Sequence, residues 1–326
     1  MILAGDVGGT KTLLGLFERE GRRLRASRIS ILASADWPTF ESMIAAFLAE
    51  GRERPRRAAF GIAGPIFRGR SQIVNLRWAV DAHKVSRAIG NKPVALLNDL
   101  EASAHGLNEL TPRQIVNLTP GLKPGDGNVA LISPGTGLGM AILVRDGARL
   151  LVSASEGGHA DFAPRDADEA ALLEYVQRRH PRVSQERIVA GPGFSAIYDF
   201  LVDTGREKAS PAMLERLASG DRNAAVSEAG VEGSDPAAER AVEMFVSLLG
   251  AAAGNLALVA KASGGVFVGG GIPPRILPKL REGTFLESFR AKGRLRRFLE
   301  SVPVKVVVEP RLGLFGAAAH AAPPRT

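Results

Sequence analysis

Two stretches of this chain share one pattern, and that pattern limits the fold more than any other feature does. The sequence ILAGDVGGTKTLLGLF fills Ile2–Phe17, and VALISPGTGLGMAILV fills Val129–Val144. Each is an apolar run, a Gly/Thr turn and a second apolar run, which predicts strand, turn, strand. Glycine leaves backbone N–H groups open to a ligand. Two such turns facing each other can hold a polyphosphate.

An ordinary hairpin is the alternative for either stretch alone, because Gly-Gly and Gly-Thr are common turn residues. The GxxxxGK[ST] phosphate loop is absent, and strand-like residues follow the turn where that motif requires a helix. The repetition favours the phosphate interpretation. Asp6, at the end of the first predicted strand, is well placed to meet a Mg²⁺ ion carried by phosphates.

The length of 326 residues predicts two domains. The pattern that starts at Ile2 begins again at Val129, so we expect a duplicated α/β architecture with a cleft between the halves. The apolar segment Pro93–Leu97 predicts a strand in the middle of a covered sheet. The apolar run Met244–Ala260 predicts a buried helix and is marginal for a membrane span.

Charge and cysteine content exclude several classes of protein. The net charge is +8, but the basic residues are scattered and form no basic helix face, so we expect no nucleic-acid partner. The chain has no cysteine, which excludes disulfides and thiolate metal sites. Its start has no basic region followed by a long apolar segment, so we expect a cytoplasmic protein with no membrane partner.

Two groups of polar residues follow predicted strands. Asn98 and Asp99 end the Pro93–Leu97 strand, where ligands gather in α/β sheets and where an Asp can take a proton from a hydroxyl. The alternative is that the pair caps the next helix. Glu156 and His159 flank two glycines, an arrangement suited to vicinal hydroxyls, although a plain loop is the alternative. Glu186, taken alone, is a surface charge.

Together these motifs resemble the bacterial glucokinase family, the hexokinase-like branch of the actin/Hsp70/sugar kinase superfamily. The matching segments occur in the family's order over nearly the whole chain: GDVGGT (5–10), LLND (96–99), GTGLG (135–139), EGGHADFAP (156–164), ERIVAGPG (186–193), GGVFVGGGI (264–272) and LGLFGAAAH (312–320).

The resemblance implies an α/β, duplicated actin-like/ribonuclease H-like ATPase fold, with a small lobe of residues 1–110 and 301–326 and a large lobe of residues 111–300. It implies an ATP-dependent kinase that phosphorylates the 6-hydroxyl of D-glucose, the first step of glycolysis. ATP would enter as Mg-ATP, with no resident metal, and a homodimer is expected from relatives. Closure of the lobes around the sugar would assemble the site and exclude water.

The resemblance also assigns roles to residues. Asp99 resembles the family's catalytic base. The implied sugar-binding residues are Asn98, Asp99, Glu156, His159 and Glu186. The implied nucleotide-binding residues are Gly5, Asp6, Val7, Gly8, Gly9, Thr10, Gly135, Thr136, Gly137, Gly269, Gly270 and Gly271. Asp6 would reach the Mg²⁺ through water.

There are three alternatives to this interpretation, and the sequence argues against the first two. Lys11-Thr12 is similar to the repressor/open-reading-frame/kinase (ROK) group, but the cysteine-rich motif of that group is missing. A sugar-responsive repressor would need a helix-turn-helix domain, and we expect none here because the first predicted strand starts at Ile2. A kinase for another hexose or amino sugar, such as mannose, glucosamine or N-acetylmannosamine, is the nearest alternative within the enzyme class.

Overall fold

A computed structural model describes residues 1–21, 23–73, 76 and 78–323 of the chain. The chain divides into two compact units, the first made of Met1–Pro112 and Glu309–Thr326 and the second of Arg113–Val308. The second unit includes the last strand because that strand pairs with two strands of the second sheet. The resemblance implies a boundary at residue 300 instead.

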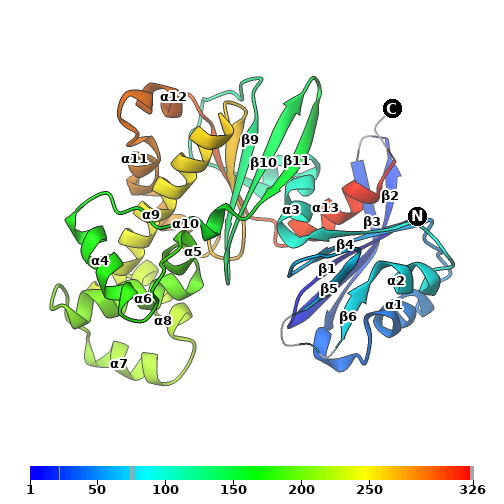
Figure 1. Cartoon of the computed structure of the whole chain (residues 1–326), viewed down its shortest axis with the longest axis horizontal. Coiled ribbons are helices and arrows are strands. Elements are labelled where there is room, and N and C mark those ends of the chain that lie inside the picture. The colour runs from blue at the N-terminus through cyan, green and yellow to red at the C-terminus, as the bar shows by residue number, and fades with distance from the viewer. Residues whose placement is uncertain (22, 74–75, 77, 324–326) are drawn as a thin grey trace. The chain divides into compact units, whose positions relative to one another are not determined.

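Unit 1 is built on a sheet with the strand order β3-β2-β1-β4-β7, beside a separate β5-β6 hairpin (Figure 1). Its strands are β1 (Ile2–Val7), β2 (Lys11–Glu20), β3 (Arg23–Ala33), β4 (Arg57–Ile62), β5 (Arg70–Gln72), β6 (Ala79–Asp81) and β7 (Val94–Asn98). Its helices are η1 (Ser34–Asp36), α1 (Phe40–Ala49), α2 (Ala82–Ala88), α3 (Asp99–Gly106), η2 (Leu107–Glu109) and α13 (Leu312–Ala321), with η3 (Pro112–Gln114) at the unit boundary.

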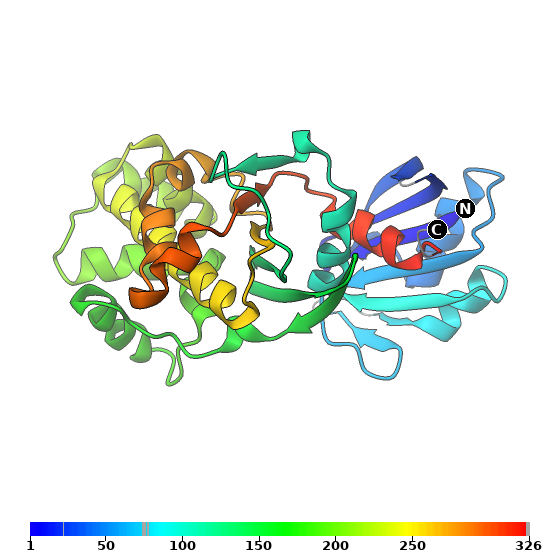
Figure 2. The same cartoon turned by 90° about the horizontal axis from the view of Figure 1, so that it is seen from above.

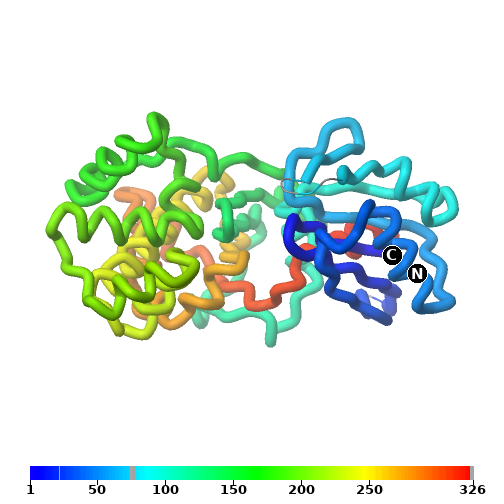
Figure 3. Tube along the Cα trace, turned by 90° about the horizontal axis from the view of Figure 1, so that it is seen from below, coloured from blue at the N-terminus to red at the C-terminus, as the bar shows by residue number. Residues whose placement is uncertain are grey.

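Helices cover both faces of this sheet, because alternate residues of each strand point to opposite sides. Leu3 and Val7 of β1 pack with Phe40 and Phe47 of α1, whereas the neighbouring Ile2 packs on the α3 and α13 side. Figures 2 and 3 show unit 1 from above and from below, with α13 in red in Figure 2. The result is a three-layer α/β/α unit.

Strand β7 corrects one expectation from the sequence. The wholly apolar run predicted a central strand, but β7 forms an edge of the unit 1 sheet in the described part of the chain. Val94 and Leu96 pack toward the α1 and α2 side, and Ala95 and Leu97 toward α3 and α13. The apolar run therefore reflects cover on both faces by helices, which an edge strand can also have.

Unit 2 has a mixed sheet with the order β11-β10-β9-β12-β13-β8. Its strands are β8 (Ile115–Asn117), β9 (Val129–Pro134), β10 (Leu138–Asp146), β11 (Arg149–Ser155), β12 (Gly265–Val268) and β13 (Val304–Val307). Its helices are η4 (Gly157–His159), α4 (Ala167–Gln177), α5 (Gln185–Ile188), α6 (Gly191–Asp203), α7 (Pro211–Ala218), α8 (Arg222–Glu232), α9 (Pro236–Ala260), α10 (Leu277–Arg281), α11 (Thr284–Arg290), η5 (Gly293–Leu295) and α12 (Arg296–Glu300).

Helix α9 organises the helical part of unit 2 and confirms the buried helix expected over Met244–Ala260. It packs against α6, α8 and α11, and its residues Phe245 and Leu249 are fully buried. Among the described residues it is the one helix whose length and composition would allow it to cross a membrane. Most of its apolar surface is instead buried inside unit 2.

Both predicted hairpins are present, one in each unit. Strands β1 and β2 are antiparallel and pair Val7 with Thr12, and residues 8–10 form the turn between the two strands. Strands β9 and β10 pair Pro134 with Leu138, which leaves residues 135–137 as the second turn. The repeated sequence pattern therefore marks the same local structure in both sheets.

Candidate functional site

The carboxyl ends of three parallel strands carry the predicted residues of unit 1. The register pairs Val7 of β1 with Ile62 of β4, and Ile62 with Asn98 of β7. Asp6 and Asp99 therefore lie at the same edge of the sheet. Gly61 of β4 lies between them and lets α3 come close, because a Cβ there would stand 2.8 Å from the Cβ of Ala102.

Asp6 is a carboxylate in an unfavourable environment. Burial raises the pKa of the Asp6 carboxyl to about 6, the nearby Asp99 carboxylate acts in the same direction, and the Lys11 ammonium opposes both. Asp6 makes no hydrogen bond or ion pair with any other residue that the structure describes. The start of α13 faces it, since a Cβ on Gly313 would lie 3.1 Å from Asp6 Oδ2.

These properties of Asp6 fit a cation brought by the substrate. In the described residues, no group of three or more His, Asp or Glu side chains is arranged to hold a metal ion. One unpaired carboxylate can contact a Mg²⁺ ion that takes its other ligands from phosphates and water. Unit 1 therefore suits a Mg²⁺ that arrives with a nucleotide.

Ser34 forms hydrogen bonds to the turn at Gly8–Thr10. The Gly8 N–H donates to the Lys11 carbonyl at 3.1 Å, and the Ser34 hydroxyl donates to the Gly8 carbonyl at 2.7 Å. The Ser34 N–H donates to the Thr10 carbonyl at 3.0 Å, and its Oγ lies 2.9 Å from Thr12 Oγ1. Sequence reasoning missed Ser34 because it lies 24 residues or more beyond the turn.

Asn98 and Asp99 stand where β7 passes into α3. Asn98 is the N-cap residue, and its Oδ1 accepts a hydrogen bond from the Leu100 N–H at 2.9 Å. Asp99 is the first residue of α3, and its Oδ1 also accepts from Leu100 N–H, at 2.8 Å. The capping role is confirmed for Asn98. The first turn of a helix is also a favourable place for the negative charge of Asp99.

In unit 2, the predicted nucleotide and sugar residues meet at the β9–β10 turn. The Gly135 N–H donates to the Gly137 carbonyl at 2.8 Å, and the Gly191 N–H at the start of α6 donates to the Gly135 carbonyl at 2.8 Å. On the other side, Glu186 Oε2 accepts a hydrogen bond from the Leu138 N–H at 3.0 Å. The turn is thus held at one end by α6 and at the other by Glu186.

The three polar side chains assigned to the sugar form one cluster. His159 lies between two carboxylates, with Nε2 3.9 Å from Glu156 Oε2 and Nδ1 3.8 Å from Glu186 Oε1. Glu156 and His159 are exposed, whereas the side chain of Glu186 keeps 31% of its surface accessible. Acceptors and a donor at this spacing can bind adjacent hydroxyl groups.

The Gly269–Gly271 segment follows β12 beside the same turn. Gly270 has a φ of 89°, which only glycine adopts easily, and any Cβ there would clash with the Pro134 carbonyl. Gly271 has no atom within 4 Å of the position of a Cβ. The segment therefore packs on the end of β9 through Gly270 and leaves Gly271 open.

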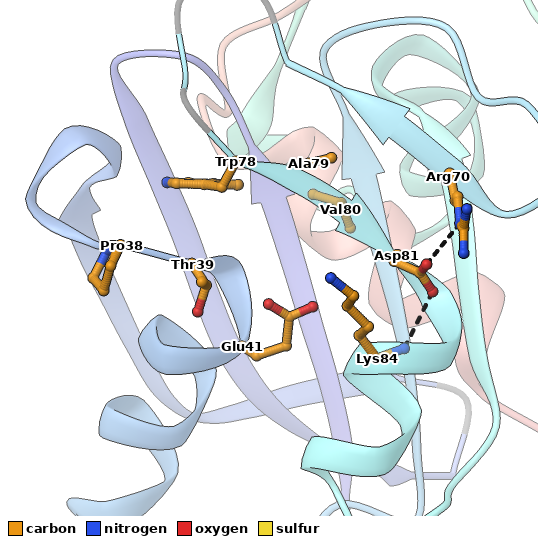
Figure 4. Close-up of a pocket in the computed structure, with 9 residues that line it drawn as sticks. All are labelled: Pro38, Thr39, Glu41, Arg70, Trp78, Ala79, Val80, Asp81 and Lys84. Atoms are coloured by element: carbon orange, nitrogen blue, oxygen red, sulfur yellow. Dashed lines mark hydrogen bonds and ion pairs between the residues drawn. The ribbon is translucent and has the colours of Figure 1, made fainter.

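Two cavities, one in each unit, are lined by residues other than the predicted site residues. One of about 420 Å³ in unit 1 is lined by Trp78, Glu41 and Lys84, among others, beside the Arg70–Asp81 ion pair (Figure 4). One of about 210 Å³ in unit 2 is lined by α9 and the segment after η4. Neither contains a predicted site residue, so the candidate site rests on the strand ends and turns.

Comparison with known proteins supports the assignment of the fold and the family. The family model described as Glucokinase matches residues 3–324. The chain is 37% identical to a glucokinase of Trichormus variabilis, with 99% of each chain covered. It is 35% identical to a glucokinase of Synechocystis, covering 98% of this chain and 97% of that one.

Solved structures agree with the sequence relatives. A glucokinase from an Antarctic psychrotroph superposes with a TM-score of 0.85 at 31% identity, covering 98% of both chains. A ROK family glucokinase from Streptomyces griseus, in complex with glucose and AMPPNP, has a TM-score of 0.62 at 25% identity, again over 98% of both chains.

The duplicated α/β architecture and its paired glycine turns define an actin-like sugar kinase. Within that class, the family model that matches nearly the whole chain and the relatives above 30% identity point to one particular family. The chain belongs to the glucokinase family. It is therefore a sugar kinase, as its sequence motifs predict.

Proposed function

We propose that this protein transfers the γ-phosphoryl group of ATP to the 6-hydroxyl of D-glucose, giving glucose 6-phosphate and ADP as the first step of glycolysis in the cytoplasm. The observation that carries the proposal is the position of Asp99 at the strand edge beside Asp6, together with the contact of Glu186 with both His159 and the Gly135–Gly137 turn in unit 2. The Streptomyces relative bound to glucose and AMPPNP supports this choice of substrates.

In this proposal, each unit contributes residues with a defined role in the reaction. Glu156, His159, Glu186 and Asn98 bind hydroxyls of the sugar and orient its 6-hydroxyl. Asp99 accepts the proton of that hydroxyl as its oxygen bonds to the γ-phosphorus and the bond to the bridging oxygen of ADP breaks.

The nucleotide would be bound mainly by backbone groups. The turns at Gly8–Thr10 and Gly135–Gly137 offer N–H donors to phosphate oxygens, and Gly269–Gly271 lies beside the second turn. Mg²⁺ supplies positive charge to the phosphates when it is bound, and Asp6 is the residue that would hold it. Phosphoryl transfer depends on such positioning and charge stabilisation.

The proposal is tested by ADP release across a panel of hexoses with wild-type protein and two variants. Asp99→Asn should fold normally and lower kcat by about 10² to 10⁴, the usual contribution of a general base. Glu101→Gln removes another carboxylate from the first turn of α3 and should leave kcat close to wild type. Wild-type turnover in Asp99→Asn would remove Asp99 from the mechanism.

The same panel decides between substrates. Higher kcat/KM with mannose, glucosamine or N-acetylmannosamine than with glucose would reassign the enzyme to the alternative hexose or amino sugar. Thermal protection gives an independent readout, since a ligand stabilises the folded state by RT ln(1 + [L]/Kd). We also propose a homodimer, which sedimentation of the purified chain would show.

A further inference from the structure

Glu186 contacts two parts of unit 2 that the proposed reaction assigns to different substrates. Its Oε2 accepts the hydrogen bond of the Leu138 N–H at 3.0 Å, and Leu138 directly follows the phosphate-binding turn. Its Oε1 lies 3.8 Å from His159 Nδ1 in the hydroxyl-binding cluster. A single carboxylate therefore has one oxygen on the nucleotide side and one on the sugar side.

The turn itself has few internal contacts. Its one internal hydrogen bond given by the described residues joins Gly135 N–H to the Gly137 carbonyl. Beyond that, the Gly191 N–H holds the carbonyl of Gly135, and Glu186 holds the N–H of Leu138. The α6 contact is backbone to backbone, so among the contacts of the described residues the one from Glu186 depends on the state of a side chain.

We infer that Glu186 is a positioning residue that couples sugar binding to the geometry of the Gly135–Gly137 turn, a role that rests on the proposed function and extends it. A hydroxyl bound to Oε1 restricts the carboxylate and so fixes its bond from Leu138. The turn then presents its N–H groups in one arrangement. Coupling of this kind is reciprocal, so an ordered turn also favours sugar binding.

The turn ends at Gly137, where the Glu186 carboxylate leaves no space for a side chain. A Cβ on Gly137 would lie 2.6 Å from Glu186 Oε2, and its backbone does not have a positive φ. Gly137→Ala should therefore displace the carboxylate from Leu138 without straining the turn. Gly135→Ala is the matched control, since the nearest atom to its Cβ would be 4.0 Å away.

The first experiment measures glucose binding by calorimetry in the absence of nucleotide. Gly137→Ala, although it lies in the nucleotide turn, should weaken glucose binding by about tenfold, the scale of one hydrogen bond to a charged group. Gly135→Ala should keep the wild-type Kd within about twofold. Equal glucose affinity in Gly137→Ala and wild type, or equal weakening in both variants, would overturn the coupling.

The second experiment measures Mg-AMPPNP binding in the absence of sugar. Glu186→Ala removes the acceptor for the Leu138 N–H and should weaken AMPPNP binding by about tenfold. Glu186→Gln keeps an acceptor oxygen and should restore the wild-type Kd. Glu156→Ala removes an exposed sugar-side carboxylate that does not contact the turn, and should leave AMPPNP affinity unchanged.

The two arms separate this inference from the proposed function. A wild-type protein that fails to phosphorylate glucose contradicts the proposed substrate, whereas the AMPPNP arm contains no sugar and still tests the anchoring of the turn. AMPPNP affinity that is equal in Glu186→Ala and wild type would refute the role of Glu186, whatever the hexose. Circular dichroism and thermal melts of each variant confirm that it is folded.

Discussion

Asp6 offers a test of whether the strand edge of unit 1 is built for a cation at the expense of stability. Its carboxyl has a pKa of about 6 in the folded protein, compared with 3.8 as the usual value, mainly because it is buried. A raised pKa means that folding favours the protonated form. Stability is therefore lost as the pH rises from about 4 to about 6, and the full loss persists at higher pH.

The size of this loss follows from the pKa values. At 1.36 kcal/mol per pKa unit, the change from 3.8 to about 6 gives about 3 kcal/mol at pH 7.5. Partial access of water to the carboxyl reduces this, so we expect about 1–3 kcal/mol. Asp6→Asn keeps the shape and removes the charge. It should stabilise the ligand-free protein by this amount at pH 7.5 and by much less at pH 4.5.

The assay is urea denaturation followed by tryptophan fluorescence. Both tryptophans, Trp37 and Trp78, lie in unit 1, so the signal reports the unit that contains Asp6 and avoids treating two units as one transition. Asp36→Asn, at an exposed carboxylate of the same unit, is the control and should have no such pH-dependent effect. No gain in Asp6→Asn at pH 7.5, or a gain that is equal at both pH values, would refute the reasoning.

Three further predictions concern unit 1. Ser34→Ala removes the donor to the Gly8 carbonyl and leaves buried groups unpaired, so urea midpoints should fall by the equivalent of about 1–3 kcal/mol and the KM for ATP should rise. Gly316→Ala would place a Cβ against the Ala102 carbonyl at the α3–α13 contact, so it should lower the Tm and, by moving α3, lower kcat; an unchanged Tm would contradict the packing. Burial, together with the nearby His320, lowers the pKa of His105 to about 4. The stability that comes from the neutral His105 is therefore complete above pH 6.5 and is lost as the pH falls toward 4. His105→Gln should lose less stability than wild type over that range in a pH titration followed by fluorescence.

The sequence was sufficient for the hairpins because strand and turn are local properties. An apolar run, glycines and a second apolar run determine β1–β2 and β9–β10 without reference to the rest of the chain. The place of β7 in the sheet, by contrast, is not determined by its local sequence. Its apolar residues show that the two faces of the strand are covered. A central strand has this cover, and so does an edge strand that lies between helices.

The contacts that support the candidate site could not be predicted from the sequence either, because they also depend on tertiary structure. Ser34 and Gly313 reach the turn and Asp6 only because distant segments pack on the sheet of unit 1. Nothing in the residues around Ser34 distinguishes it from a surface serine. The link from Glu186 to Leu138 likewise joins segments 48 residues apart. Motifs predicted the groups for chemistry, and the tertiary structure shows which distant residues contact them.

The glycines of unit 2 show why motif residues need this second step. In the sequence, two glycines lie between Glu156 and His159, the pair whose arrangement suits vicinal hydroxyls. In the structure, the space beside Gly158 is filled by the Leu138 carbonyl, and the space beside Gly270 by the Pro134 carbonyl. These two glycines serve packing of the protein on itself. Gly135 and Gly271 instead have open space where a side chain would be, so protein packing does not account for a glycine at these two positions.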